Sequence, residues 1–326
     1  MLYRNGENLK RELSNYLTDK SNLTIFSPYI KSKPLQELLD TDGAQCDQVI
    51  VRWEPRDILT GASDLEVYQV CKERGISLYM NQRIHLKLFT ADFDSAISGS
   101  ANISERAISE NSNNYNYEIC TFTEKLSRFD RIYLASIIQE STLVTDELYK
   151  DIQLQLDNQD IGEAEFFDVP STSSKTDDFL ISKLPMTDSP KRLWEIHSDK
   201  ALPNNQQEEN CVCHDIALYN LKDLDKNMDD WLLALKHNFF KSAFISEFLA
   251  QIDSSNEYRR GRLREGLRFG AVRRWFADNT TTVPSPRPFE LTQNVQILYH
   301  WIVDLSDGAY EVNIPGAHSQ VIKRRS

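Results

Sequence analysis

The spacing of hydrophobic and polar residues predicts an α/β layer in the first part of the chain. Leu9, Leu13 and Leu17 repeat at helical spacing and predict an amphipathic helix, whereas short apolar runs predict buried strands. Strands that alternate with helices are typical of a sheet with parallel pairing. The predicted strands are residues 23–29, 48–53, 76–80 and 117–122, and the predicted helices are residues 5–18, 34–39, 65–71 and 126–148.

Residues 84–89 contain the first candidate catalytic side chains. Ile84, Leu86 and Leu88 occupy alternate positions, which predicts a strand at the centre of the sheet with one buried face. On such a strand His85 and Lys87 point together to the opposite face. The strand therefore offers an imidazole and an ammonium group side by side.

A second strand, a turn and a helix are expected to follow. Residues 94–98 are short enough to pair with the first strand, Gly99 and Ser100 make the turn, and residues 102–108 begin a helix. A turn at a helix N-terminus that carries Ser and Asn side chains can cradle an anion. Together the two strands supply the groups needed to hold a phosphoryl group and to attack it.

These residues form the pattern H-x-K, four residues, D, six residues, G-S-x-N. The pattern resembles the HKD motif of the phospholipase D superfamily, which includes phospholipases, bacterial endonucleases, some restriction enzymes and tyrosyl-DNA phosphodiesterases. The resemblance covers roughly residues 1–150, and it indicates the superfamily without indicating the substrate. The defining positions are His85, Lys87, Asp92, Gly99, Ser100 and Asn102.

The resemblance implies a reaction that needs two histidines, one as nucleophile and one as general acid. The chain has one H-x-K sequence, so we expect a homodimer whose two sites face each other. His85 is expected to form a phosphohistidine, and Lys87 to help neutralise the non-bridging oxygens. No metal or other cofactor is required, because the lysine charge takes the place of the cation.

The resemblance also assigns the remaining polar residues. Ser100 and Asn102 are expected to hold non-bridging oxygens beside Lys87. Nucleases of the superfamily carry an acid on the strand after the motif, where it orients the histidine, and Glu118 fits that position. An ordinary surface carboxylate on an edge strand is the alternative. Asp92 is expected to have a structural role, with bonds near the end of its strand or to the facing subunit.

Length and charge limit what the chain can be. Its 326 residues suggest two domains, and 40% hydrophobic residues are enough for ordinary cores. The net charge of −12 means that a polyanion must bind at a local basic patch. Neither a signal peptide nor a run long enough to span a membrane is recognisable, so a soluble, cytoplasmic protein without membrane association is expected. Cys211, Cys213 and His214 could hint at a metal site, but no second ligand pair accompanies them.

The composition changes after about residue 150. Residues 151–192 are rich in acidic residues and are predicted to be a linker, which leaves residues 193–326 as a mainly helical C-terminal domain. Near its end, residues 309–313 and 319–323 are predicted to form a hairpin. The basic residues that could bind nucleic acid are Arg259, Arg260, Arg262, Arg264, Arg268, Arg273 and Arg274.

Two interpretations of this domain stay open. Helices followed by a basic hairpin favour a winged-helix-like arrangement that binds DNA, whereas a helical interaction domain would pair its arginines with the acidic remainder of the chain. For the whole protein we expect a metal-independent DNA endonuclease of a bacterial restriction or anti-phage defence system. The alternatives are a lipid phosphodiesterase of the phospholipase D type and a DNA-binding scaffold that uses the fold for dimerisation. A partner such as a motor ATPase or helicase is expected to dock on the linker or the second part.

Overall fold

The computed structural model describes residues 2–110, 115–157, 179–221, 227–255, 257–259, 262–264, 266–280, 288–314 and 320–325. The chain divides into two compact units, residues 1–171 and residues 172–326. The division falls inside the segment predicted to be a linker. None of the described helices is long and apolar enough to cross a membrane.

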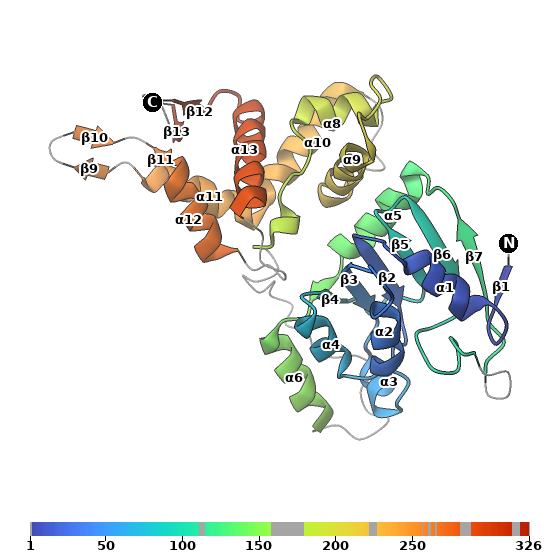
Figure 1. The fold of residues 1–326 in the computed structure, drawn as a ribbon. Coiled ribbons are helices and arrows are strands. Elements are labelled where there is room, and N and C mark those ends of the chain that lie inside the picture. The colour runs from blue at the N-terminus through green and yellow to red at the C-terminus, as the bar shows by residue number, and fades with distance from the viewer. Residues whose placement is uncertain are drawn as a thin grey trace. The chain divides into compact units, whose positions relative to one another are not determined.

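The first unit is built on an eight-stranded mixed sheet with the order β1-β7-β6-β5-β2-β3-β4-β8 (Figure 1). Strands β2, β3 and β4 are parallel, as predicted, whereas β5, β6 and β7 form an antiparallel meander beside β2. The motif strand β5 lies inside the sheet, which confirms its predicted central place. The strands are β1 (Leu2–Arg4), β2 (Leu23–Ser27), β3 (Cys46–Val51), β4 (Ser77–Met80), β5 (Leu88–Ala91), β6 (Ser95–Gly99), β7 (Ile119–Thr123) and β8 (Thr142–Leu143).

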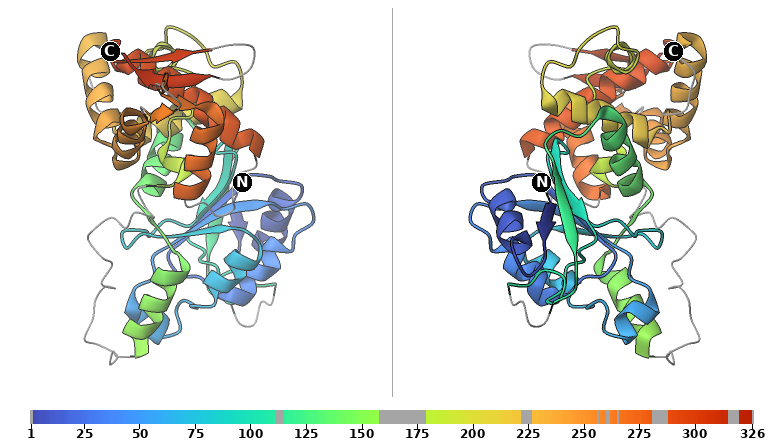
Figure 2. Two further views of the ribbon diagram at one scale, coloured as in Figure 1. Left: turned by 90° about the vertical axis from the view of Figure 1, so that its left-hand side faces the viewer. Right: turned by 90° about the vertical axis from the view of Figure 1, so that its right-hand side faces the viewer.

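Helices cover both faces of this sheet. Figures 1 and 2 show α1 and α2 on one face and α5 on the other. Side chains of α1, α2, α4 and α6 join those of the strands in one buried cluster, while Phe26 and Ile50 are fully buried outside it. The helices are α1 (Leu9–Leu17), α2 (Ser32–Leu39), α3 (Pro55–Leu59), α4 (Val67–Glu73), α5 (Arg128–Gln139) and α6 (Asp146–Asp157).

The single long helix predicted for residues 126–148 is wrong. Helix α5 begins with a capping box in which Ser127 and Asp130 satisfy each other's backbone N–H groups, and it ends at Gln139. Leu143 then pairs with Tyr79 of β4, so strand β8 separates α5 from α6. Helix α6 continues to Asp157 and occupies the beginning of the predicted linker.

The second unit is mainly helical, as predicted, with a core of fully buried aromatic side chains that includes Trp231, Phe244 and Trp301. Its hairpin of β12 and β13 is also confirmed. The elements are the short 3-10 helix η1 (Ile181–Lys183), α8 (Pro190–His197), α9 (Gln206–Leu218), α10 (Met228–Lys241), α11 (Ala243–Ser254), β9 (Glu257–Arg259), β10 (Arg262–Arg264), β11 (Leu267–Arg268), α12 (Phe269–Asn279), α13 (Pro288–Leu305), β12 (Tyr310–Asn313) and β13 (Val321–Arg324).

The last elements follow the order of a winged helix. Helix α11 is followed by β11, helices α12 and α13, and the hairpin of β12 and β13, and the sheet order is β11-β13-β12. Helix α12 packs against α13, α13 against β12, and α11 against β13. A separate hairpin of β9 and β10 is inserted between α11 and β11. The order of elements is that of the winged-helix-like arrangement expected from the sequence, and DNA binding by this domain stays a prediction.

Candidate active site

The strand pairing brings one end of each of five strands, β2, β3, β5, β6 and β7, to one edge of the sheet. Phe26 pairs with Leu88 and Ser27 with Val51, so β2 and β3 end where β5 begins. Leu88 also pairs with Ser98, so the end of β6 reaches the same edge. The residues that lie just outside these strand ends are Tyr29, Arg52, His85, Lys87, Ser100, Asn102 and Glu118. Crevices outside the carboxyl ends of parallel strands are common ligand sites in α/β folds.

His85 and Lys87 lie in the segment that leads into β5. His85 is exposed and Lys87 is half-buried, and the Lys87 Nζ donates a hydrogen bond to the His85 carbonyl oxygen at 2.8 Å. The strand begins at Leu88, four residues later than predicted, and Phe89, which the alternation placed on the face of His85, is 2% exposed. Because helices cover both faces of the sheet, alternation along β5 does not distinguish an open face from a buried one.

Lys87 stands between one positive and one negative side chain. Burial lowers the pKa of Lys87, the Glu118 carboxylate opposes that shift, and the Arg52 guanidinium adds to it. Within the described residues, Lys87 has no ion pair with a carboxylate at contact distance. A half-buried ammonium that is not neutralised at contact distance favours the binding of an anion such as a phosphoryl group.

The turn after β6 depends on glycine. A Cβ atom on Gly99 would lie 2.1 Å from the carbonyl oxygen of Ile119, closer than any side chain tolerates. This close approach allows the Ser100 N–H to donate to the Ile119 carbonyl at 3.0 Å. The Ser100 hydroxyl accepts from the Ile119 N–H at 3.1 Å and donates to the Glu118 carboxylate. Ser100 and Glu118 therefore form one unit at the end of β6 and β7.

The amide of Asn102 has one hydrogen-bonding atom without a partner among the described residues. Its Oδ1 atom is buried and has no hydrogen-bond partner among the residues that the structure describes. Buried polar atoms are almost always hydrogen-bonded, and the two ends of an amide differ only in their hydrogen-bonding role. The Asn102 amide therefore has an unused hydrogen-bonding group at this edge of the sheet, and its N–H end is the one that can donate to a phosphoryl oxygen.

The helix predicted to begin at Asn102 is wrong. Ile103 forms a parallel bridge with Ile30 and accepts a hydrogen bond from the Lys31 N–H at 2.8 Å. The Ile103 N–H is in turn bound by the Ser27 hydroxyl at 3.3 Å. These contacts with the end of β2 hold the backbone extended, and a turn follows them. The anion cradle predicted from the sequence would therefore be made by side chains, including that of Lys87, without a helix N-terminus.

The structure gives His85 a different neighbour from the one expected. Among the described residues Glu118 has its hydrogen bond with Ser100, and no hydrogen bond joins it to His85. The Tyr29 ring instead meets the His85 ring edge to face, with centroids 6.5 Å apart. The role of Glu118 in orienting His85 stays a prediction.

Arg52 holds Tyr29 in place. Its guanidinium carbon lies 4.7 Å from the centre of the Tyr29 ring, and its Nη2 donates to the Tyr29 hydroxyl at 2.9 Å. The same guanidinium binds both oxygens of Asp57 at 2.7 to 2.9 Å. Sequence reasoning missed Tyr29 and Arg52, which it had placed inside the strands predicted for residues 23–29 and 48–53. The structure ends these strands earlier, at Ser27 and Val51, so both residues lie just beyond a strand end.

Asp92 lies away from the other motif residues. It occupies the turn between β5 and β6, at the far end of the hairpin, where β5 separates it from Lys87 by about 15 Å of extended chain. The Asn22 amide donates to its carboxylate, and its φ of 52° is in the left-handed region that the turn requires. This placement supports a structural role for Asp92 and leaves it outside the group of side chains that can touch a substrate.

The arginine cluster lies in the second unit and is spread over several elements. Arg259, Arg262 and Arg264 lie on the β9–β10 hairpin, and Arg260 lies outside the described residues. Arg268 ends β11, and Arg273 and Arg274 lie on α12. The sequence alone did not show that the cluster is divided in this way.

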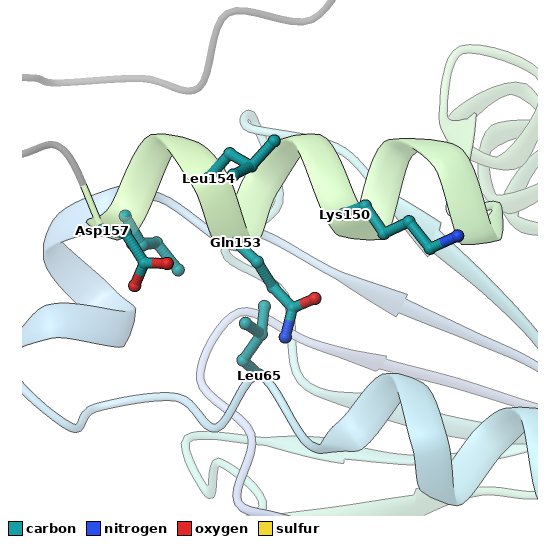
Figure 3. Close-up of a pocket in the computed structure, with 6 residues that line it drawn as sticks. Leu65, Lys150, Gln153, Leu154 and Asp157 are labelled. Carbon is teal, nitrogen blue, oxygen red and sulfur yellow. The ribbon is translucent and has the colours of Figure 1, made fainter.

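Other candidate sites are less suited to chemistry. The His214 ring nitrogens lie 2.9 Å from Asp215 and 2.8 Å from the Ser182 carbonyl, so both are used within the fold. No group of three or more potential metal ligands occurs in the described part of the chain. A pocket beside α6, shown in Figure 3, is lined by Leu65, Lys150, Gln153, Leu154, Leu156 and Asp157 and contains no motif residue.

Comparison with known proteins gives similarities of structure only. No protein-family model matches the sequence, and no curated protein matches it. Nuc from Salmonella typhimurium, a phospholipase D family member, is 14% identical over 45% of this chain and 97% of its own, with a TM-score of 0.36. NucT from Helicobacter pylori is 13% identical over 44% and 98%, with a TM-score of 0.35. Phosphatidylserine synthase from Haemophilus influenzae is 13% identical over 51% and 46%, with a TM-score of 0.36.

Proposed function

We propose that the chain is a metal-independent phosphodiesterase whose nucleophile is His85. The observation that carries this proposal is the grouping of His85, Lys87, Ser100 and Asn102 at one edge of the sheet. An imidazole nucleophile, an unneutralised ammonium and two uncharged hydrogen-bonding side chains match the needs of a phosphodiester that gains charge during attack.

The reaction proceeds in two displacements at phosphorus. A nitrogen of His85 attacks, a bond forms between nitrogen and phosphorus, and the bond to the leaving oxygen breaks with its electron pair. A second histidine gives that oxygen its proton. The same histidine then takes a proton from water, whose oxygen displaces His85 and releases the phosphate product. Lys87 and the Asn102 amide N–H group donate to the non-bridging oxygens throughout, and the Ser100 hydroxyl joins them by turning its proton from Glu118 to the phosphoryl group.

The second histidine is His85 of a second copy of the chain in a symmetric homodimer. This follows from the single H-x-K sequence and from the exposure of His85, which leaves its ring open to a partner. The test is to mix wild-type chains with His85→Ala chains under conditions in which subunits exchange. If an active dimer requires two intact chains, an equal mixture contains about one active dimer in four. The activity per total amount of protein is then about one quarter of that of pure wild type. A fall to about one half means that each chain works alone.

DNA is the proposed substrate, with the enzyme acting as an endonuclease in bacterial restriction or anti-phage defence. Support comes from the arginines of the second unit, since phosphate backbones are bound by such side chains. A motor ATPase or helicase is a proposed partner, and absence of co-purification with any such protein would count against it.

The decisive experiment is cleavage of plasmid and single-stranded DNA in EDTA by wild type and by His85→Ala. Wild type is expected to cleave, and the variant to be at least about a thousandfold slower because the nucleophile is gone. His237→Ala, which removes an exposed histidine of α10, is the matched control and is expected to cleave normally. Cleavage by His85→Ala at the wild-type rate would falsify the assignment. An alkali-stable, acid-labile phosphate on His85 would identify the intermediate.

A further inference from the structure

The basic residues of the second unit fall into two groups that the sequence does not distinguish. The first group lies on and beside β13, where each basic side chain is neutralised by a carboxylate. Arg324 pairs with Asp253 at 3.0 Å, and Lys323 and Arg325 pair with Glu311 at 3.3 and 2.9 Å. Hydrogen bonds from Asn313 and from these two cations lower the pKa of Glu311. This hairpin therefore presents little free positive charge.

The second group consists of Arg268, which directly precedes α12, and of Arg273 and Arg274 within that helix. Arg268 and Arg274 are exposed, and neither side chain has a hydrogen bond or ion pair with any described residue. Arg273, half-buried beside them, has a buried Nε atom without a hydrogen-bond partner in the described parts of the chain. Unpaired guanidinium groups are suited to the bidentate binding of phosphates.

No large hydrophobic residue of α12 is fully exposed beside these arginines, although Phe269 and Trp275 are half-buried. Gly270 and Ala271 are exposed on the same turn, and a Cβ atom on Gly270 would meet only open space. A membrane-binding helix would instead present large apolar or aromatic residues here. At Gly270 and Ala271 no bulky side chain stands in the way of an approaching polyanion.

Helix α13 packs against α12 and presents amide side chains to solvent. Gln293 and Gln296 are exposed in its N-terminal half, while Val295, Ile297 and Leu298 are buried. In helix-turn-helix proteins one helix crosses the DNA backbone, and the N-terminal residues of the next helix contact base edges in the major groove. Glutamine can recognise adenine there with two hydrogen bonds.

We propose that α12 and α13 form a face that binds double-stranded DNA. Arg268 and Arg274 bind phosphates, and Gln293 and Gln296 contact base edges in the major groove. The basic residues of the β12–β13 hairpin contribute little, because their charge is already used within the fold. This proposal depends on the proposed function in one respect, which is that the polyanion is taken to be DNA.

The test is binding of a fluorescently labelled duplex of mixed sequence by the full chain with His85→Ala, which prevents cleavage. Arg268→Ala with Arg274→Ala is expected to weaken binding at least about tenfold and to lower the slope of log K against log salt by about 2, because two phosphate contacts are lost. The matched control is Arg324→Ala with Arg325→Ala, which removes two arginines that are comparably exposed but paired, and it is expected to change affinity less than about threefold. All variants should show the same thermal unfolding as the parent.

Equal losses from both arginine pairs, or no loss from Arg268 and Arg274, would overturn the proposal. The glutamines are tested by selection from a pool of randomised duplexes. The parent should enrich a sequence, and Gln293→Ala with Gln296→Ala should lose that enrichment while its salt dependence stays unchanged. Failure of the parent to enrich any sequence refutes base contact by α13. If the chain with His85 intact binds the duplex normally but does not cleave DNA, the proposed function is refuted and this inference is not.

Discussion

Replacing Arg52 by methionine is expected to destabilise the first unit and to slow the reaction at His85. The Arg52 side chain is 16% exposed and its partner Asp57 only 6% exposed. Removing the cation leaves the Asp57 carboxylate buried without a countercharge. Breaking a buried ion pair in this way costs about 3 to 5 kcal/mol, and the residual exposure of Arg52 places the loss near 3 kcal/mol. The loss corresponds to a fall of roughly 6 to 12 °C in the melting temperature of a unit of this size.

The same substitution affects the active site through Tyr29. The tyrosine loses both the hydrogen bond to its hydroxyl and the cation over its ring, and His85 then loses the fixed edge contact that limits its orientation. Because small displacements of a reacting group cost one to two orders of magnitude in rate, kcat is expected to fall about tenfold or more. Loss of the Arg52 charge is also expected to raise the pKa of Lys87.

The assays are urea unfolding of each variant and cleavage kinetics below its melting temperature. A second variant, Asp57→Leu together with Arg52→Met, removes both charges and is expected to recover most of the stability without recovering kcat. The reasoning is refuted if Arg52→Met alone costs less than about 1 kcal/mol, or if the double variant loses at least as much stability as the single one.

Three further outcomes are expected. Glu118→Gln removes the charge that raises the pKa of Lys87, so the alkaline loss of kcat/KM should move to lower pH. An unchanged pH profile would mean that the Glu118 charge does not influence the titration that limits activity. Gly99→Ala forces the strand ends apart and should cost about 2 kcal/mol by urea unfolding, whereas Gly270→Ala on open helix surface should not destabilise. Cleavage should persist in EDTA, and complete loss on chelation would contradict a mechanism in which Lys87 replaces a metal.

The sequence predicted elements well where the signal was local. Continuous apolar runs located β2, β3 and β4, and helical spacing located α1. Errors arose where distant segments decide the local structure. Pairing of Leu143 with β4 interrupts the expected long helix, and contacts of Ile103 with the end of β2 replace the expected helix after Asn102. Both contacts join segments that lie far apart in the sequence, so no window of neighbouring residues reveals them.

The same limit applies to the candidate site. The motif residues could be named from their spacing, because β5, β6 and the turn between them are consecutive in the sequence. Tyr29 and Arg52 come close to His85 and Lys87 only because β2 pairs with both β3 and β5. Their side chains have no distinguishing pattern until that pairing is known.

Because the chain is acidic overall, its unpaired cations are the groups most important for binding a polyanion. With a net charge of −12, the field of the whole protein repels a polyanion, so binding must come from a few local contacts. The fold neutralises Arg52, Arg324 and Arg325 with nearby carboxylates. By contrast Lys87 and Arg274 have no such partner among the residues described. Charges that a folded chain leaves uncompensated are the ones that gain most from an incoming phosphate, and here they lie beside the proposed nucleophile and on the proposed DNA-binding face.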